Sequence, residues 1–340
     1  MSSVVELRLE QSTPAFTGHF RPEVVDRTYY LRPQSLKGVW RWLARAVVAG
    51  AMYDLGYLCG EARDGLKRPT KRETRAISRI VGKVMGLGYA DPSGRESEAS
   101  RFALRVEVIR EPRVRSARTG SIYFRGRQVR LQRLQLLTMT RGGAKRELQY
   151  FEGGAFRLIV TRVASRDREG EELALRTLVL ALSLLGVGKG SRRGLGSFDV
   201  VNVRGLYVER DPYSFLNRTY DTALRVVKRH LGETGVAPCS ERGLPPLPSI
   251  CKGSHLGMHA FSLYRVEASW ADVHDFFLRS ERCKRLTGSY KGTDKLRRDL
   301  EAWVLGLPRS QRGTGYVAES VDRRASPILV AAHGLSLIHI

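Results

Sequence analysis

Short segments in which apolar and polar residues alternate predict half-buried strands at several points of the chain. In residues 4–11, the apolar Val5, Leu7 and Leu9 alternate with charged side chains. The same alternation predicts a strand over 102–108. Further strand candidates are 128–140, 155–163 and 197–203.

In two other segments the apolar residues are spaced as on one face of a helix. In the first, Leu36, Leu43 and Val47 form an apolar stripe together with Val39 or Trp40. Pro33 lies just before this stripe and Ser35 is the expected N-cap, whereas Gly50 weakens the far end. A second helix is predicted over 171–185, where Gly186 ends it. Residues 60–82 are dense in charge and are expected to form an inserted or solvated helical segment.

The resulting order is strand, helix, several strands, helix and strand, which is the split β-α-β order of ferredoxin-like domains. A second and more degenerate unit of the same class is predicted from residue 206. Its expected elements are helices at 212–231, 271–285 and 293–305, a Pro-rich linker at 238–248, and strands at 258–266 and 327–332.

The predicted fold class is therefore α+β, with tandem ferredoxin-like (RRM-like) domains at 1–205 and 206–335. The tail 336–340 follows the last predicted strand without turn chemistry. It resembles the foreign ends of gene predictions from assembled fragments, so it is kept out of the fold prediction and the second domain is expected to lack its last strands.

The charge of the chain points to a polyanionic partner. Its 340 residues hold 58 Lys and Arg against 34 Asp and Glu, a net charge of +24. Arg accounts for 47 of the cations, and guanidinium groups pair with phosphates and stack on bases. Nucleic acid is thus the expected partner. Adaptation to heat is the alternative source of charge, and it is compatible with the presence of only two Asn residues.

The four cysteines indicate neither a disulfide scaffold nor a CxxC site, because no two of them are closely spaced. Cys251, His255 and His259, with Cys239 or Cys283 as a fourth ligand, have irregular spacing, so no metal site and no cofactor are expected. The N-terminus has no signal-peptide pattern, and the most apolar run, 173–187, is too short to span a bilayer. These features predict a cytoplasmic protein that does not enter membranes.

A glycine-rich loop is the most specific motif in the sequence. Residues 186–198 read GVGKGSRRGLGSF, between a predicted helix and a predicted strand. The loop follows a helix and precedes a strand, which is the reverse of the order in a Rossmann fingerprint. A Walker A loop needs Ser or Thr after its Lys, and here Lys189 is followed by Gly190. Glycine amides form anion nests. We therefore expect RNA contacts from the loop residues Gly186, Gly188, Lys189, Ser191, Arg192, Arg193, Gly194 and Gly196; a tight turn without a ligand is the alternative.

Two further patches are candidates for RNA contact. Lys37, Arg41 and Arg45 recur every fourth residue and form one cationic ridge on the first helix. Trp40 flanks this ridge and is expected to stack on a base, whereas Trp42 is expected in the core.

The second patch is the stretch 112–146, which contains ten cations and no acidic residue. A basic hairpin carrying aromatic side chains is typical of a single-stranded RNA contact. The residues singled out here are Tyr123, Phe124, Arg125 and Arg127; a surface loop that only raises solubility is the alternative.

These motifs resemble those of the RAMP superfamily, the RNA-binding proteins of CRISPR systems. The loop GVGKGSRRGLGSF resembles the glycine-rich hallmark of that family. The stretch LRPQSLKGVWRW (31–42) is similar to one in the first subunits of type III-B (Cmr) effector complexes. Further anchors are TPAFTG (13–18), MGLG (85–88) followed by SRF (100–102), LGLP (305–308) and RRASPI (323–328). The chain departs from the family at His19, where a glycine is usual, and in the insertion at 60–82.

The resemblance implies a non-catalytic RNA-binding subunit in an antiviral ribonucleoprotein. Such a subunit contacts the 3′ region of the guide RNA and the target RNA beside other RAMP subunits. A RAMP endoribonuclease that matures guide RNA without metal is the alternative, because some members use His or Tyr for proton transfer. His19, with Tyr29 and Tyr30 downstream, is the only candidate set for that chemistry. A ribosome- or tRNA-associated protein explains the charge but not the ordered motifs.

Overall fold

The computed structural model describes residues 3–18, 21–63, 66–91, 94, 96–118, 120–130, 134, 137–138, 146–240, 243–254, 261–267 and 328–334. The predicted helices at 271–285 and 293–305, His19, and the tail 336–340 lie outside these residues and stay predictions.

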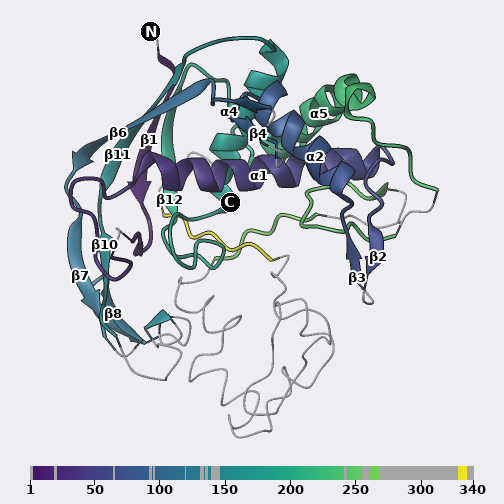
Figure 1. The fold of residues 1–340 in the computed structure, drawn as a ribbon. Coiled ribbons are helices and arrows are strands. Elements are labelled where there is room, and N and C mark those ends of the chain that lie inside the picture. Colours follow the sequence, from purple (N-terminus) through teal and green to yellow (C-terminus); the bar gives the residue numbers. More distant parts are fainter. Residues whose placement is uncertain are drawn as a thin grey trace, which may run out of the picture.

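An antiparallel four-stranded sheet forms one side of the described fold, and the helices lie against one of its faces (Figure 1). Its strands are β1 (Ser3–Gln11), β6 (Phe102–Arg110), β11 (Ala155–Arg162) and β12 (Phe198–Arg204), in the order β12-β1-β11-β6. Helix α1 (Pro33–Asp54) follows β1, and helix α4 (Arg168–Leu184) joins β11 to β12. This is the order of a ferredoxin-like unit, as predicted for the first part of the chain.

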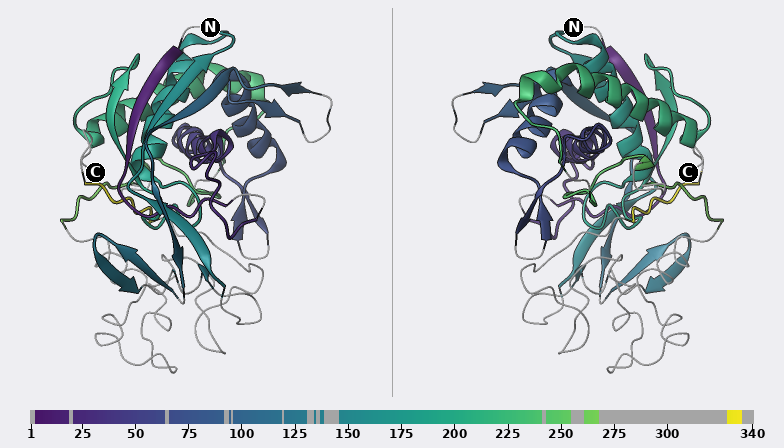
Figure 2. Two further views of the ribbon diagram at one scale, coloured as in Figure 1. Left: turned by 90° about the vertical axis from the view of Figure 1, so that its left-hand side faces the viewer. Right: turned by 90° about the vertical axis from the view of Figure 1, so that its right-hand side faces the viewer.

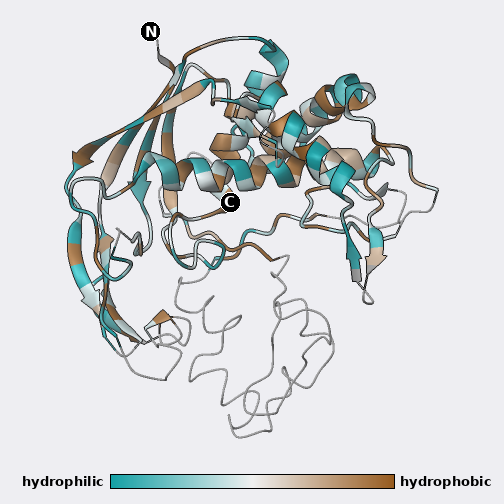
Figure 3. Ribbon diagram, viewed as in Figure 1, coloured by the Kyte–Doolittle hydropathy of each residue, from teal (hydrophilic) through white to brown (hydrophobic). Residues whose placement is uncertain are grey.

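Smaller elements extend this unit at both sides. One group carries residues 61–98: β2 (Glu61–Arg63), β3 (Leu66–Arg68), α2 (Lys71–Arg79), a π-helical turn (Ile80–Val84), β4 (Tyr89–Ala90) and β5 (Ser97–Glu98). The other group continues from the sheet: β7 (Arg113–Ala117), β8 (Ser121–Phe124), β9 (Arg127–Arg130) and β10 (Leu148–Glu152). Figure 3 shows β7 and the β2–β3 hairpin as mainly hydrophilic.

The predicted helix around Trp40 is longer than the sequence suggested. It begins at Pro33 with Arg32 as N-cap, so the prediction of Ser35 as N-cap is wrong. It also continues through Gly50 to Asp54. Gly50 lies inside the helix because the segment around Ile250 crosses it closely: a Cβ at Gly50 would lie 1.6 Å from the Ile250 carbonyl oxygen.

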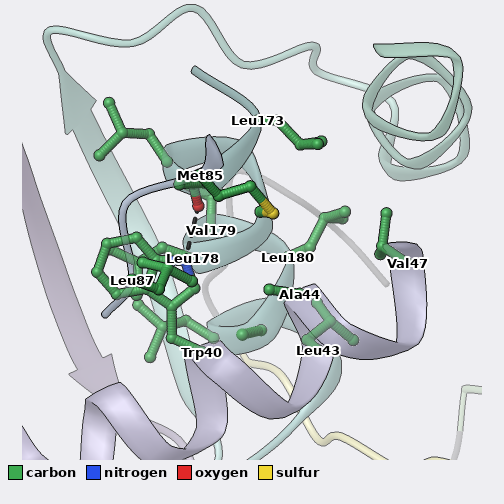
Figure 4. Packing of buried hydrophobic residues seen from close by; sticks show 14 of the residues in the cluster. Trp40, Leu43, Ala44, Val47, Met85, Leu87, Leu173, Leu178, Val179 and Leu180 are labelled. Atoms are coloured by element: carbon green, nitrogen blue, oxygen red, sulfur yellow. Dashed lines mark hydrogen bonds between the residues drawn. The ribbon is translucent and has the colours of Figure 1, made fainter. Parts of the chain in front are cut away.

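The hydrophobic core lies between the sheet and helices α1 and α4 (Figure 2). The inward side chains of β1 are Val5, Leu7 and Leu9, each at most 1% exposed. Figure 4 shows the side chains of Trp40, Leu43, Ala44 and Val47 from α1 beside those of Leu178, Val179 and Leu180 from α4. The apolar stripe predicted from the sequence is therefore the buried face of α1.

Helix α5 (Pro212–His230) packs into this same core, followed by a 3₁₀ turn (Leu231–Thr234). Phe215, Ala223 and Val226 of α5 are fully buried there. The helix that was expected to open the second unit therefore shares the core of the first. The division of the chain at residue 205 stays a prediction, because residues 268–327 lie outside the described residues.

Three predicted strands differ from the structure. Leu134 and Leu137 are helical, so a strand does not continue from β9 to residue 140. Residues 261–266 of the predicted strand 258–266 have no regular structure. Of the predicted strand 327–332, Val330 forms a single parallel bridge with Arg193.

A disulfide joins Cys59 to Cys239, 180 residues apart in the sequence. The expectation of no disulfide was wrong, because short cysteine spacing carries no information about pairs that only the tertiary fold brings together. The bridge ties the root of the β2–β3 hairpin to the Pro-rich segment after α5, where the Cys239 amide also donates to the Gly56 carbonyl at 2.7 Å. No helix among the described residues is long and apolar enough to cross a membrane.

Gly50→Ala is expected to destabilise the protein by about 1–3 kcal/mol, because the added methyl group collides with the Ile250 backbone. Gly38 lies in the same helix with open space around its Cα, so Gly38→Ala is the matched control. It is expected to stabilise the helix by about 0.5–1 kcal/mol. Urea unfolding measures both, and equal effects of the two substitutions would contradict the close approach of Ile250.

Reduction of the Cys59–Cys239 bridge is expected to lower the free energy of unfolding by about 2–5 kcal/mol, since the bridge closes a long loop. Thermal unfolding with and without reductant measures this loss. The double variant Cys59→Ser/Cys239→Ser should not respond to reductant, whereas Cys251→Ala, which removes the buried free thiol, should respond as the wild type does. Identical wild-type curves in both conditions would refute the bridge.

Candidate nucleic-acid interface

The glycine-rich loop connects α4 to β12 and lies against the segment that follows β1. The Gly196 amide donates to the Pro14 carbonyl at 2.8 Å, and the Lys189 amide donates to the Phe16 carbonyl at 3.0 Å. The Ser197 amide donates to the Thr13 hydroxyl at 2.9 Å. Two sequence anchors, 13–18 and 186–198, are therefore packed together in space.

The glycines of the loop are required by its own folding. Gly186 and Gly196 cross closely: a Cβ on Gly186 would lie 1.9 Å from the Leu195 carbonyl oxygen, and one on Gly196 would lie 2.2 Å from that of Val187. Four loop glycines have a positive φ, namely Gly188, Gly190, Gly194 and Gly196. The Gly186 and Val187 amides donate within the loop, to Ser191 and Gly196 carbonyls. These two amides therefore serve the loop's own fold.

The three cations of the loop have different surroundings. The Lys189 ammonium donates to the Pro22 carbonyl at 2.5 Å, and its pKa is lowered by burial and then by the nearby charge of Arg146. The Arg193 guanidinium donates to the Ile328 carbonyl at 3.1 Å. The Arg192 guanidinium lies 5.5 Å from the centre of the Trp42 ring. Arg192 is therefore the loop cation that is placed on an aromatic face.

The structure contradicts the role predicted for Trp40. Trp40 is fully buried, its indole nitrogen donates to the Ala174 carbonyl at 2.7 Å, and its ring packs on Phe102. It has no exposed face for a base, so the stacking prediction for Trp40 is wrong. Trp42 is partly buried and packs against the core, as predicted, and its ring also faces Arg192. The helical spacing in the sequence distinguishes the two residues, because Trp40 falls on the apolar stripe of Leu36 and Leu43 whereas Trp42 does not.

The cationic ridge of α1 is present, but its members differ. Arg41 donates from Nε to the Leu87 carbonyl at 2.8 Å and so fastens α1 to the 85–88 turn. Burial and then Arg45 lower the pKa of Arg41, and burial and then Arg41 lower the pKa of Lys37. Arg45 is exposed and, three residues after Trp42, neighbours it on the helix surface. Lys37 and Arg45 thus remain for a ligand, while Arg41 serves the fold.

The acid-free stretch contains the predicted hairpin, formed by β8 and β9. Its turn is Arg125-Gly126, both with positive φ. Tyr123 is 45% exposed, and Arg115 lies over its ring at 4.9 Å. Arg125 lies 5.5 Å from the centre of the Phe124 ring.

Acidic residues outside the stretch neutralise part of its charge. Arg115 pairs with Glu152 at 2.8 Å, Arg118 with Glu147 at 3.1 Å, and Arg146 with Glu23 at 3.0 Å. Within the described residues, Arg125 and Arg127 at the tip of the hairpin have no such ion pair. The tip therefore carries the charge available to a polyanion.

The structure brings the three predicted patches to one side of the molecule. Arg192 joins the loop to α1 through Trp42, and Arg146 of the basic stretch lies close enough to Lys189 to lower its pKa. The hairpin reaches the same place, because a Cβ on Gly334 would meet the Arg125 guanidinium at 3.3 Å. We call the surface formed by Trp42, Arg45, Arg125, Lys189 and Arg192 the basic surface.

One segment at this surface was missed by the sequence analysis. Residues 328–334 run along the loop: the Val330 amide donates to the Arg192 carbonyl, and the Ala332 amide donates to the Ser197 hydroxyl. His333 contacts Asp199 of β12. The apolar pattern of this segment signalled a strand, but nothing in it indicated the loop as its partner.

Of the candidate set for proton transfer, Tyr29 and Tyr30 are among the residues that the structure describes, whereas His19 is not. Tyr30 is buried and its hydroxyl donates to Glu111 at 2.5 Å; burial and then Glu111 raise its pKa. Tyr29 is 57% exposed. Among the described residues no group of His, Cys, Asp and Glu has the geometry of a metal site. Burial raises the pKa of the Cys251 thiol to about 12.

Solved structures similar to this chain include type III-B subunits. A chain of the type III-B Cmr-beta complex bound to cognate target RNA has 12% identity and a TM-score of 0.49, with 87% of this chain and 78% of that chain covered. Cmr1 from Pyrococcus furiosus has 18% identity and a TM-score of 0.42, with 90% and 77% covered. A further Cmr-beta chain has 15% identity and a TM-score of 0.37, and this chain spans 59% of its length.

No curated protein matches the sequence. The family model for the RAMP superfamily matches residues 8–199, which run from β1 through the glycine-rich loop into β12. This span contains β6, β11 and the helices α1 and α4, with parts of β1 and β12, and it is more than half of the chain. The chain therefore belongs to the RAMP superfamily.

Proposed function

We propose that this chain is a non-catalytic RNA-binding subunit of a type III-B CRISPR ribonucleoprotein. It contacts the 3′ region of the guide RNA and the target RNA in antiviral defence. The proposal rests on membership of the RAMP superfamily and on the sequence anchors, such as 31–42, that resemble the first Cmr subunit. Its tandem RRM-like domains, other RAMP subunits as partners and a cytoplasmic location belong to the same proposal.

The observation that supports RNA binding is that the three predicted patches meet at the basic surface. Trp42 and the tip aromatics Tyr123 and Phe124 each lie beside an Arg guanidinium. Phosphates pair with guanidinium groups while exposed bases stack on such rings, which together give sequence-tolerant binding of single strands. Duplexes hide their base faces, so single-stranded RNA suits this surface best.

The absence of catalysis is part of the proposal. RNA cleavage without metal needs an acid and a base at the scissile phosphate. Tyr30 is withdrawn from solvent and bonded to Glu111, so it suits the fold better than proton transfer. The endoribonuclease alternative then depends on His19 and Tyr29, and no contact of the described residues favours it.

Arg192→Ala is expected to weaken binding of single-stranded RNA about tenfold, because both a phosphate partner and a stacking neighbour of Trp42 are lost. Phosphate contacts release counterions, so the slope of log affinity against log salt should fall by about 0.7. Fluorescence anisotropy with a labelled oligonucleotide measures both values.

Arg72→Ala is the matched control for charge. Arg72 is exposed on α2, so its removal changes the net charge equally without touching the basic surface. It should leave the affinity nearly unchanged. Equal losses in the two variants would show that net charge alone attracts the RNA and would overturn the assignment of the surface.

Repeat RNA incubated with the purified chain in EDTA is expected to stay intact, because the subunit binds without cleaving. Gel electrophoresis of the products measures this. Cleavage that disappears in His19→Ala would replace the binding subunit by the metal-independent endoribonuclease. Cleavage that persists in His19→Ala would indicate a contaminating nuclease, to be settled by repeating the assay with the Arg192→Ala protein.

A further inference from the structure

The charged insertion at 60–82 carries a second cationic surface, which the proposed function does not use. In Figure 1 its hairpin β2–β3 and helix α2 lie at the right of the molecule, whereas β7 and β8 lie at the left. The acidic residue of α2, Glu73, is turned inward and is 3% exposed. The exposed side chains of α2 are Lys71, Arg72, Thr74 and Arg75. The outer face of this helix is therefore cationic without an acidic residue of its own.

The fold does not require the first two of these cations. Lys71 and Arg72 directly follow the N-cap Thr70. The helix dipole places its positive end there, so cations at these two positions oppose helix formation and acidic residues would favour it. Arg75 pairs with Asp91 at 3.4 Å, whereas Lys71 and Arg72 have no ion pair among the described residues. Their charge is thus available to a partner.

The Pro-rich segment after α5 adds an apolar side chain beside the cations of the insertion. A Cβ on Gly243 would lie 2.8 Å from the ammonium nitrogen of Lys67 in β3. The next residue, Leu244, is 62% exposed. Apolar side chains surrounded by charged ones are the usual composition of a protein–protein interface. We call the surface formed by Lys67, Lys71, Arg72 and Leu244 the insertion face.

The two segments that form the insertion face are fastened to each other. The Glu73 carboxylate accepts the amides of Cys59 at 2.6 Å and Gly60 at 2.9 Å. It also completes the capping box with Thr70, which fixes the start of α2. The disulfide between Cys59 and Cys239 then joins the root of the hairpin to the Pro-rich segment. A face that is ordered in advance loses little conformational freedom when a partner binds.

An acidic protein segment fits the insertion face better than RNA does. On the basic surface, Arg192 lies beside the ring of Trp42. In the described part of the insertion and its flanks, Tyr57 packs against the core and Tyr89 is 7% exposed. A single strand of RNA therefore finds cations here but no described ring on which a base could stack. Carboxylates complement the same cations, and an apolar side chain between them covers Leu244.

We infer that the insertion face docks a partner protein, through a segment in which carboxylates surround an apolar side chain. The inference goes beyond the proposed function, because it requires no contact with RNA. It gives the two cationic surfaces different tasks: the basic surface with its aromatic rings binds RNA, and the insertion face with its apolar residue binds protein.

A labelled synthetic peptide with Glu residues around one central Leu serves as the probe. Fluorescence anisotropy with the full chain is measured in about 0.15 M salt, where charges are screened beyond about 8 Å. Lys71→Glu/Arg72→Glu should weaken peptide binding about tenfold or more, because two attractions become repulsions. Acidic residues at these positions favour the helix, so thermal unfolding should show no loss of stability. No binding by the wild type, or equal binding by this variant, would overturn the inference.

The apolar contact is tested with a second peptide in which Ser replaces the central Leu. Leu244→Ser should weaken binding of the Leu peptide about fivefold, because buried apolar area is lost. It should leave binding of the Ser peptide unchanged, so the double-mutant cycle isolates the contact between the two leucines. Equal effects on both peptides would contradict the apolar part of the insertion face.

Arg125→Glu/Arg192→Glu is the matched charge reversal on the basic surface. It should keep the affinity for the peptide and lose that for single-stranded RNA, whereas Lys71→Glu/Arg72→Glu should do the opposite. Peptide binding that is lost in the Arg125→Glu/Arg192→Glu protein overturns the inference and leaves the proposed function intact. RNA binding that is lost only in the Lys71→Glu/Arg72→Glu protein makes RNA the ligand of the insertion face and also overturns it. No RNA binding by the wild type overturns the proposed function, while the peptide titrations still decide the inference.

Discussion

The burial of Trp40 between α1, α4 and the sheet determines the geometry of the rest of the structure. Its indole bonds to the Ala174 carbonyl and its ring contacts Phe102, so α1 cannot rotate about its own axis without losing both contacts. Residues two apart on a helix point about 200° away from each other. Fixing Trp40 inward therefore places Trp42 at the edge of the core, where Arg192 of the glycine-rich loop faces its ring. One core contact thus aligns two segments that are 150 residues apart.

Alternation and helical spacing predicted the sheet and its two helices well, because local periodicity records which face of an element is buried. The strands β1, β6, β11 and β12 and the helices α1, α4 and α5 lie close to their predicted ranges. Features that depend on distant pairing were not predictable: Cys59 with Cys239, His333 with Asp199, and α5 in the first core. For the candidate site, the predicted hairpin is present as β8 and β9, and the contacts of the loop and the hairpin with RNA stay predictions. The prediction for Trp40 was wrong although its spacing places it on the apolar stripe.

Part of the large positive charge of the chain is used within the fold. Arg101 is 4% exposed and pairs with the buried Glu171 at 3.3 Å, which fastens the start of α4. Arg41 is bonded to a turn, and on the outer face of the sheet Glu10 lies between Arg8 and Arg110. Guanidinium groups suit these structural tasks because their five donors reach carbonyl and carboxylate oxygens together. The Arg excess therefore reflects the fold as well as the ligand.

The contacts between residues 328–334 and the glycine-rich loop have a consequence for the order in which the protein folds. The loop is bonded to residues 12–18, which are synthesised before it, and to residues 328–334, which are synthesised after it. The sheet β12-β1-β11-β6 is complete once residue 204 has left the ribosome, so this unit can form during synthesis while its loop still lacks the contacts of residues 328–334. The basic surface therefore acquires its last contacts only after the sheet that carries it has been synthesised.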